Sequence, residues 1–124
     1  MINGFVAVGL GAAIGAWVRW GLAVVLNTSI IPMGTLIANL LGGYLMGVIF
    51  ALIVHLPDLS AEMRLFITTG FLGGLTTFST FSAEAFHLLH REQYGYALAH
   101  VLLHVLGSLL LTAAGYFTVQ YLRS

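Results

Sequence analysis

The chain has 124 residues, of which 60% are hydrophobic and only 6% are charged. A soluble domain carries about 25% charged residues, so this composition excludes an ordinary soluble surface. The formal net charge is zero and lysine is absent, which argues against a nucleic-acid partner. Cysteine is absent too, so disulfides and thiol chemistry are excluded.

Long charge-free windows predict an all-α membrane protein with four transmembrane helices. A hydrocarbon core about 30 Å thick needs roughly 20 apolar residues per helix. The windows without a charged residue are 1–18, 20–57, 65–83 and 93–122. We expect one transmembrane domain, 1–124, with helices at about 3–26, 34–55, 59–91 and 94–122.

The first two expected helices carry small residues four apart, as at Gly11 and Gly15 and at Gly43 and Gly47. Such faces let helix backbones approach closely in lipid, either within one chain or between two chains. Asn39 lies in the middle of the second helix, where its amide must find hydrogen-bond partners.

The third expected helix contains the main signal, GGLTTFSTFS at 73–82. Asp58 is the expected N-cap of this helix, because it follows Pro57 and precedes Glu62 in the first turn. Each glycine costs a helix roughly 1 kcal/mol relative to alanine, and the hydroxyls offer the backbone alternative partners. We therefore expect a break near 73–77, where irregular backbone is tolerated only if it is buried in protein or lines water.

Phe78 and Phe81 are three residues apart, so they share a helix face, and Ser79 and Thr80 lie beside them. Aromatic edges carry partial positive charge, so ring edges and hydroxyl donors can receive an anion. The alternative is a pair of phenylalanines that only face lipid or fill the core. Glu84 is the one carboxylate nearby, which disfavours a cation site.

Arg19 and Glu84 are costly inside a membrane and are functional candidates, unless their side chains reach the interface. In the fourth helix, Ser108 and Thr112 are one turn apart and extend a possible polar track. His100 and His104 have a spacing that suits a metal ion. Without a cysteine or carboxylate on the same helix, hydrogen-bonded or vestibule histidines are favoured.

The arginines predict an antiparallel dual-topology homodimer. With four spans, Arg64 and Arg123 share one side of the membrane, and Arg91 lies on the other with Arg19, if Arg19 reaches that interface. The positive-inside rule needs an asymmetry to set orientation, and two against two provides none. Four thin helices can hardly enclose a polar pathway alone, so an oligomer is expected.

Three stretches together resemble the CrcB/Fluc family of fluoride channels: GLGAAIGAWVRW (9–20), GTLIANLLGGYLMG (34–47) and TTGFLGGLTTFSTFSAE (68–84). The resemblance covers essentially the whole chain. It implies an antiparallel dual-topology homodimer in a bacterial inner membrane, with a broken third helix and two fluoride pathways. Passive export of fluoride would protect the cell against fluoride toxicity.

The resemblance also implies roles for particular residues. The fluoride pathway would be lined by Asn39, Phe78, Ser79, Thr80, Phe81, Ser108 and Thr112. Vestibule or pathway polar positions would be Arg19 and Glu84. A structural sodium ion (Na+), shared by two subunits, would be held by the main-chain carbonyls of Gly73 and Thr76.

Two other readings remain open at this point. A proton-coupled small multidrug-type transporter would want a carboxylate deep in the first helix, which has none, so Glu84 would have to serve. A non-transporting membrane subunit would leave the hydroxyls of 73–82 unexplained. No nucleophile with a base, phosphate loop, haem motif or flavin motif is present, so an enzyme is not expected.

Overall fold

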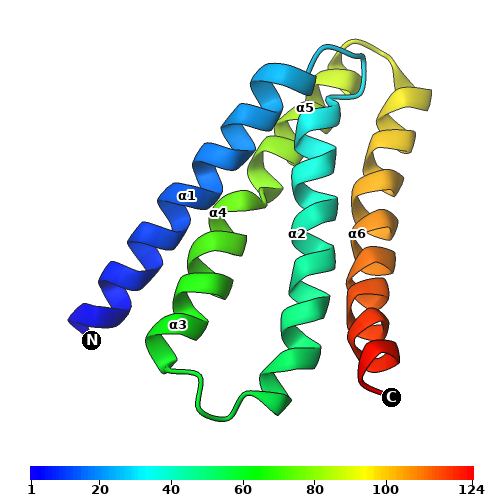
Figure 1. Cartoon of the computed structure of the whole chain (residues 1–124). Coiled ribbons are helices and arrows are strands. Elements are labelled where there is room, and N and C mark those ends of the chain that lie inside the picture. Colours follow the sequence, from blue (N-terminus) through cyan, green and yellow to red (C-terminus); the bar gives the residue numbers. More distant parts are fainter.

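The computed structural model describes all 124 residues, and every regular element in it is helical (Figure 1). The elements are α1 (Ile2–Leu26), α2 (Met33–Leu52), η1 (Ile53–His55), α3 (Ala61–Leu65), η2 (Phe66–Leu72), α4 (Gly73–Leu75), α5 (Phe78–His90) and α6 (Tyr94–Arg123). The prediction of an all-α protein is confirmed.

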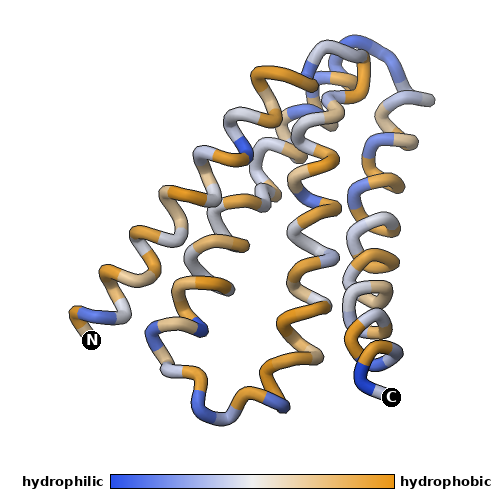
Figure 2. The backbone as a smooth tube through the Cα atoms, in the orientation of Figure 1, coloured by the Kyte–Doolittle hydropathy of each residue, from blue (hydrophilic) through white to orange (hydrophobic).

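Three helical stretches are long and apolar enough to cross a membrane, namely Ile2–Leu26, Met33–His55 and Tyr94–Arg123. Hydrophobic residues run along these helices, and hydrophilic residues gather at the loops and chain ends (Figure 2). The chain is therefore a multi-pass membrane protein. The remaining apolar part, from α3 to α5, consists of several shorter helical elements.

The helices run alternately up and down, so both termini and the loop between α2 and α3 lie at one end of the molecule (Figure 1). The loops from α1 to α2 and from α5 to α6 lie at the opposite end. Arg64 in α3 and Arg123 at the end of α6 belong to the first end, whereas Arg91 follows α5 at the second.

The start of α3 corrects one sequence prediction. Asp58 is not the N-cap, because the chain turns between Leu56 and Leu59, whose N–H donates to the Leu56 carbonyl at 3.1 Å. The helix begins at Ala61, three residues after Asp58, and Ser60 caps it by accepting a hydrogen bond from the Met63 N–H at 3.1 Å.

Close backbone approach holds the helices together at two glycine positions. Gly15 in α1 is buried, and a Cβ there would collide with the carbonyl of Phe71. Gly47 in α2 packs in the same way on the Thr112 carbonyl in α6. Small residues permit this proximity, which supplies the van der Waals packing that drives helix association in lipid. At these two positions the small residues are used within the chain.

The centre of the molecule is a small apolar cluster of Ala38, Leu72 and Leu75, each at most 2% exposed. Leu72 and Leu75 flank the two glycines of α4, and Ala38 precedes Asn39 in α2. Packing at this point fixes α4 against the middle of α2. The cluster therefore positions the stretch where helical structure stops.

Candidate functional site

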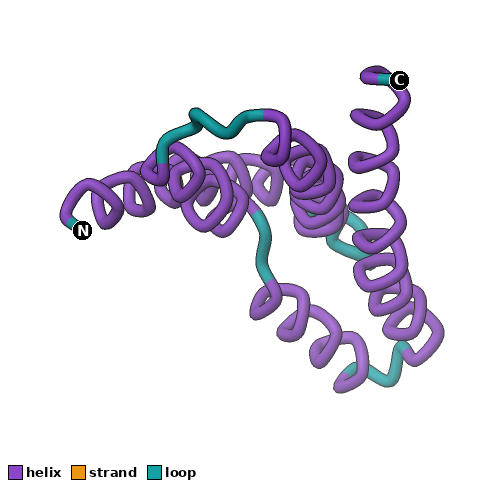
Figure 3. The backbone as a smooth tube through the Cα atoms, turned by 90° about the horizontal axis from the view of Figure 1, so that it is seen from below, coloured by secondary structure: helices purple, strands orange, loops and turns teal.

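Two consecutive residues, Thr76 and Thr77, leave the helical conformation between α4 and α5. Their φ and ψ angles are −92° and 158° for Thr76 and −152° and 120° for Thr77, which is extended backbone. The turn from α4 into α5 is visible as a short loop in Figure 3. Extended backbone within a membrane needs partners from the protein, because lipid offers none.

Asn39 supplies those partners to Thr77. The Thr77 N–H donates to Asn39 Oδ1 at 2.7 Å, and Asn39 Nδ2 donates to the Thr77 carbonyl at 3.0 Å. These two bonds fix which end of the amide is oxygen. The second hydrogen of Asn39 Nδ2 faces Nδ1 of His104 at 3.0 Å, so that nitrogen must be the acceptor. Asn39 therefore links α2 to the extended residue and to α6.

Hydroxyls satisfy other groups around the extended pair. Thr76 Oγ1 donates to the Leu72 carbonyl at 2.8 Å. Thr77 is the N-cap of α5, and its Oγ1 accepts from the Thr80 N–H at 3.1 Å. A hydroxyl that accepts at this position satisfies one of the free donors of a helix start. Thr77 thus compensates locally for a lost helical bond, whereas the Leu72 carbonyl also keeps its helical bond with the Thr76 N–H at 3.0 Å.

The same bonds leave carbonyls at the end of α4 without their helical partners. In an uninterrupted helix the Gly73 carbonyl would receive the Thr77 N–H, which here donates to Asn39. The Thr76 carbonyl would receive the Thr80 N–H, which here donates to Thr77 Oγ1. The carbonyls of Gly73 and Thr76, two oxygens near each other in sequence, are therefore free for other ligands.

Arg19 is held at this same helix end. Its Nε donates to the Gly74 carbonyl at 3.0 Å, across 55 residues of sequence. A cation beside a helix C-terminus is favourable, because the free carbonyls there carry partial negative charge. The guanidinium therefore stabilises the end of α4.

Phe78 and Phe81 begin α5 and meet edge to face, with ring centroids 5.6 Å apart and an interplanar angle of 63°. Phe78 is 78% exposed in the single chain, whereas Phe81 is only 8% exposed. Phe81 lies against two histidine rings, with centroid distances of 5.3 Å to His100 and 4.6 Å to His104. The two phenylalanines thus have different environments, one facing outward and one packed on α6.

An open cavity of about 700 Å³ lies beside the extended pair. It collects seven of the eleven residues to which the resemblance assigns roles, together with His104: Asn39, Gly73, Thr76, Phe78, Phe81, Ser108 and Thr112. It does not include Ser79, Thr80, Arg19 or Glu84. Ser79 is exposed, and Thr80 and Glu84 line a separate cavity of about 220 Å³.

The two hydroxyls of α6 that line the large cavity, those of Ser108 and Thr112, are not equivalent. The single hydrogen of Thr112 Oγ1 lies within reach of two carbonyls, Gly43 at 3.0 Å and Ser108 at 2.9 Å. Ser108 itself makes no side-chain hydrogen bond within the chain, so its hydroxyl hydrogen is free to serve as a donor to an occupant of the cavity. Thr112 offers mainly its lone pairs.

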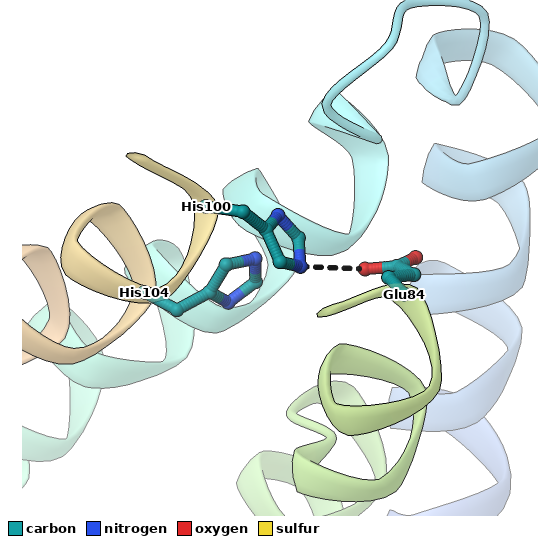
Figure 4. A group of neighbouring side chains, drawn as sticks. All are labelled: Glu84, His100 and His104. Carbon is teal, nitrogen blue, oxygen red and sulfur yellow. Dashed lines mark ion pairs between the residues drawn. The ribbon is translucent and has the colours of Figure 1, made fainter. Parts of the chain in front are cut away.

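Glu84 belongs to a second line of polar contacts, separate from the line that joins Thr77, Asn39 and His104. Its Oε2 accepts from Thr35 Oγ1 at 2.7 Å, and Thr35 Oγ1 in turn accepts from Asn27 Nδ2 at 3.2 Å. Its Oε1 lies 3.4 Å from Nε2 of His100 (Figure 4). This is the only ion-pair contact in the structure. Contacts from α2 and α6 therefore meet at this carboxylate of α5, and the loop after α1 is joined to it through Thr35.

The geometry can now be set beside known proteins. The model of the family described as "CrcB-like protein, Camphor Resistance (CrcB)" matches residues 6–116. The chain belongs to the CrcB family. The resemblance inferred from the sequence motifs is confirmed.

Curated proteins similar to this CrcB chain are named "Fluoride-specific ion channel FluC". The protein of Aromatoleum aromaticum is 56% identical over 90% of this chain and 87% of its own length. That of Cupriavidus pinatubonensis is 56% identical over 96% of each chain, and that of Pseudomonas putida is 51% identical over 98% of each. The similarity thus extends over nearly the whole length of both partners.

The sequence analysis gave the two α6 histidines of this CrcB chain no specific role beside the cavity. His100 and His104 are 0% and 4% exposed, and His104 completes the bonding of Asn39. Their position in the sequence of α6 could have indicated that they share a helix face with the cavity hydroxyls. Ser108 and Thr112 continue a four-residue spacing that starts at His100 and passes through His104. Thr35, one turn before Asn39, has the matching position on α2.

The role of Asn39 predicts a specific defect in Asn39→Ala. The Thr77 N–H and carbonyl would both lose their partner, at a cost of about 1–3 kcal/mol for each buried group. We expect a lower free energy of unfolding in a denaturant titration and faster amide hydrogen exchange at Thr77. Asn3→Ala is the control, because Asn3 is exposed and makes no side-chain hydrogen bond. Unchanged exchange in Asn39→Ala would show that Thr77 does not depend on this amide.

Proposed function

We propose that this chain forms a fluoride-selective ion channel through which fluoride leaves the cytoplasm passively, protecting the cell against fluoride toxicity. The observation that carries the proposal is near-full-length similarity, at 51–56% identity, to proteins named fluoride-specific ion channels. That name describes a channel and not an enzyme. The relatives compared are bacterial, so we place the protein in the bacterial inner membrane.

The lining of the large cavity supports an anion as the transported ion. It contains amide, hydroxyl and aromatic groups but no carboxylate. Fluoride is small and tightly hydrated, so several donors must replace its water together. The Ser108 hydroxyl is free, and the edges of Phe78 and Phe81 carry partial positive charge. Both hydrogens of Asn39 are committed within the chain, so Asn39 serves the pathway by holding the Thr77 backbone and the His104 ring in place beside the ion.

The remaining proposed pathway residues have supporting positions. Thr112 places its lone pairs beside Ser108 and orders that part of the cavity. Ser79 and Thr80 lie on α5 outside the large cavity, and Glu84 shares the smaller cavity with Thr80. We propose that Thr80 and Glu84 line a vestibule. Arg19 acts through the end of α4, where it holds the Gly74 carbonyl.

The driving force requires no coupled ion. Neutral hydrofluoric acid enters a cell and ionises in the more alkaline cytoplasm, which traps the anion. A potential of 100 mV, negative inside, contributes about 2.3 kcal/mol per charge to its exit. The alternative, a proton-coupled small multidrug-type transporter, lacks a carboxylate in α1. Glu84 would have to serve, and it lies outside the large cavity.

A second copy of the chain, inserted in the opposite orientation, is proposed to complete the pathway. The large cavity is open at the surface of one chain, where Phe78 and Gly73 are exposed. Arg64 and Arg123 lie at one end and Arg91 at the other, while Arg19 is bound to the Gly74 carbonyl and does not count at either end. A difference of one arginine is a weak orientation signal, which supports insertion in both orientations, and we propose an antiparallel homodimer.

We propose that α3 to α5 form the fourth membrane crossing, a single span broken at Thr76 and Thr77. The segment connects the two ends of the molecule (Figure 1), and the charge-free window 65–83 lies within it. A break at membrane depth is permitted when its backbone is bonded to protein, and Asn39 provides such bonds.

A structural sodium ion is proposed at the broken span, shared by the two subunits. The carbonyls of Gly73 and Thr76 fit this role, because the N–H groups that would otherwise pair with them donate to side chains. Main-chain carbonyl oxygens suit hard cations. Gly73 is exposed on the single chain, so a partner could reach the same point. The ion would tie together two helix ends that carry partial negative charge.

The proposed function predicts selective efflux from liposomes. Purified protein should release fluoride rapidly from vesicles loaded with potassium fluoride and leave chloride trapped, as read by ion-selective electrodes. Protein-free vesicles are the control. Equal release of both anions, or drug-driven proton movement without anion release, would defeat the proposal.

The phenylalanines provide a sharper test. Phe78→Ile and Phe81→Ile preserve apolar volume, so stability should change by less than about 1.5 kcal/mol. If each ring edge contributes about 1.4 kcal/mol to ion passage, fluoride efflux should fall about tenfold in each variant. Phe117→Ile is the control, since Phe117 is 64% exposed and lies outside the cavity.

Gel-filtration profiles must first establish that the variants fold. Folded Phe78→Ile and Phe81→Ile proteins with the same fluoride efflux as the unmodified chain would remove the aromatic part of the proposed pathway.

The proposed insertion in both orientations predicts that a chain restricted to one orientation transports little fluoride. Several lysines added after Ser124 should place the C-terminal end in the cytoplasm, so that this chain, expressed alone, inserts in one orientation and transports little fluoride. Coexpression with a chain forced into the opposite orientation should restore efflux. Full activity from chains shown by labelling to share one orientation would contradict the antiparallel dimer.

A further inference from the structure

A cluster of three side chains joins α5 to α6 beside Phe81, whose ring contacts both histidines of the cluster. Glu84 points from α5 toward His100 and His104, which project from successive turns of α6 (Figure 4). One ligand atom from each of the three lies within 4.8 Å of the others. The carboxylate that α6 itself lacks is thus supplied by another helix.

Polar atoms in this cluster have no hydrogen-bond partner. They are Nδ1 and Nε2 of His100, Nε2 of His104 and Oε1 of Glu84. Both histidines are at least nine-tenths buried. Buried polar atoms are nearly always paired, so unpaired atoms on three side chains whose ligand atoms lie this close together call for a ligand. Glu84 has no arginine within ion-pair distance, which leaves its charge without a permanent cation.

We propose that Glu84, His100 and His104 bind a divalent transition-metal ion, with Zn²⁺ as the representative. Imidazole nitrogen and carboxylate oxygen are ordinary ligands of this class. Bond lengths near 2.0–2.1 Å in a tetrahedral site separate the ligands by about 3.3 Å. Glu84 Oε1 and His100 Nε2 are already 3.4 Å apart. The third ligand approaches by small side-chain rotations, and water takes the fourth position.

An ion can reach this cluster from outside. The cavity of about 220 Å³ is lined by Glu84 together with Thr80 and His87. His87 is exposed, and so is Ile30 of the loop between α1 and α2, which lines the same cavity, so the cavity opens beside that loop. The carboxylate is the first of the three ligands that an entering ion meets.

Metal binding opposes the bonding of Asn39. If Nδ1 of His104 takes the metal, its lone pair is no longer available to Asn39 Nδ2. If Nε2 takes the metal, the ring proton moves to Nδ1 and two donors face each other. In either case Asn39 loses the contact that it makes while holding Thr77. On the proposed function, on which this step rests, the ion therefore inhibits fluoride passage.

Zn²⁺ binding to the purified protein tests the site first, before any measurement of fluoride transport. Purified protein in detergent is titrated with Zn²⁺ in competition with a chromophoric chelator, and Co²⁺ is added separately to record its ligand-field absorption. We expect one ion per chain and a tetrahedral Co²⁺ spectrum. Glu84→Gln, His100→Gln and His104→Gln should each weaken binding at least tenfold, while His55→Gln and His90→Gln leave it unchanged.

Glutamine keeps the length and hydrogen bonding of each position, and gel filtration checks the fold. Absence of saturable Zn²⁺ binding overturns the site. Binding that the three substitutions do not weaken, or that His90→Gln abolishes, assigns the ion to the exposed surface and also overturns it. These results need no fluoride, so they are independent of the proposed function.

The inhibitory effect is then measured as fluoride efflux from liposomes with Zn²⁺ on both sides. Efflux should slow as the site fills, recover after addition of a chelator, and become insensitive to Zn²⁺ in His100→Gln. Zinc that binds at the cluster without slowing efflux refutes the competition with Asn39.

Discussion

The structure depends on the pairing between one extended residue, Thr77, and one amide side chain, Asn39. In lipid an unpaired backbone group costs several kcal/mol, so the chain could not leave the helix here without a substitute partner. Asn39 offers an acceptor and a donor on one planar group, which matches the N–H and carbonyl of a single residue. Aspartate would lack the donor, and glutamine would place the same groups one methylene farther away.

This pairing also decides where charge can be stabilised. The end of α4 keeps free carbonyls and therefore attracts positive groups, as its bond with Arg19 shows. The start of α5 is different, because Thr77 already caps one of its N–H groups. On the proposed function, an anion beside Phe78 would therefore also use side-chain donors, namely the free hydroxyl of Ser108 and the aromatic edges.

The sequence located the irregular stretch but not its partner. Glycines and hydroxyls at 73–82 weaken a helix through local preferences, which a sequence reveals directly. That Thr76 and Thr77 are the extended residues follows from Asn39, 38 positions away. The same limit explains Glu84, whose bonds reach Thr35 and His100 on other helices. Side chains can be recognised as polar from sequence, whereas their pairing across helices requires the fold.

The two polar lines of the molecule meet at the histidines. One line runs from Thr77 through Asn39 to His104 and borders the large cavity. The other includes Glu84, which borders the small cavity and faces His100. The two imidazoles lie edge to face, with centroids 4.5 Å apart. Because Asn39 requires an acceptor at Nδ1 of His104, any change of that ring's protonation or ligation alters Asn39 as well. By linkage the effect is reciprocal, so any change in the bonding of Asn39 must in turn change what the histidines bind.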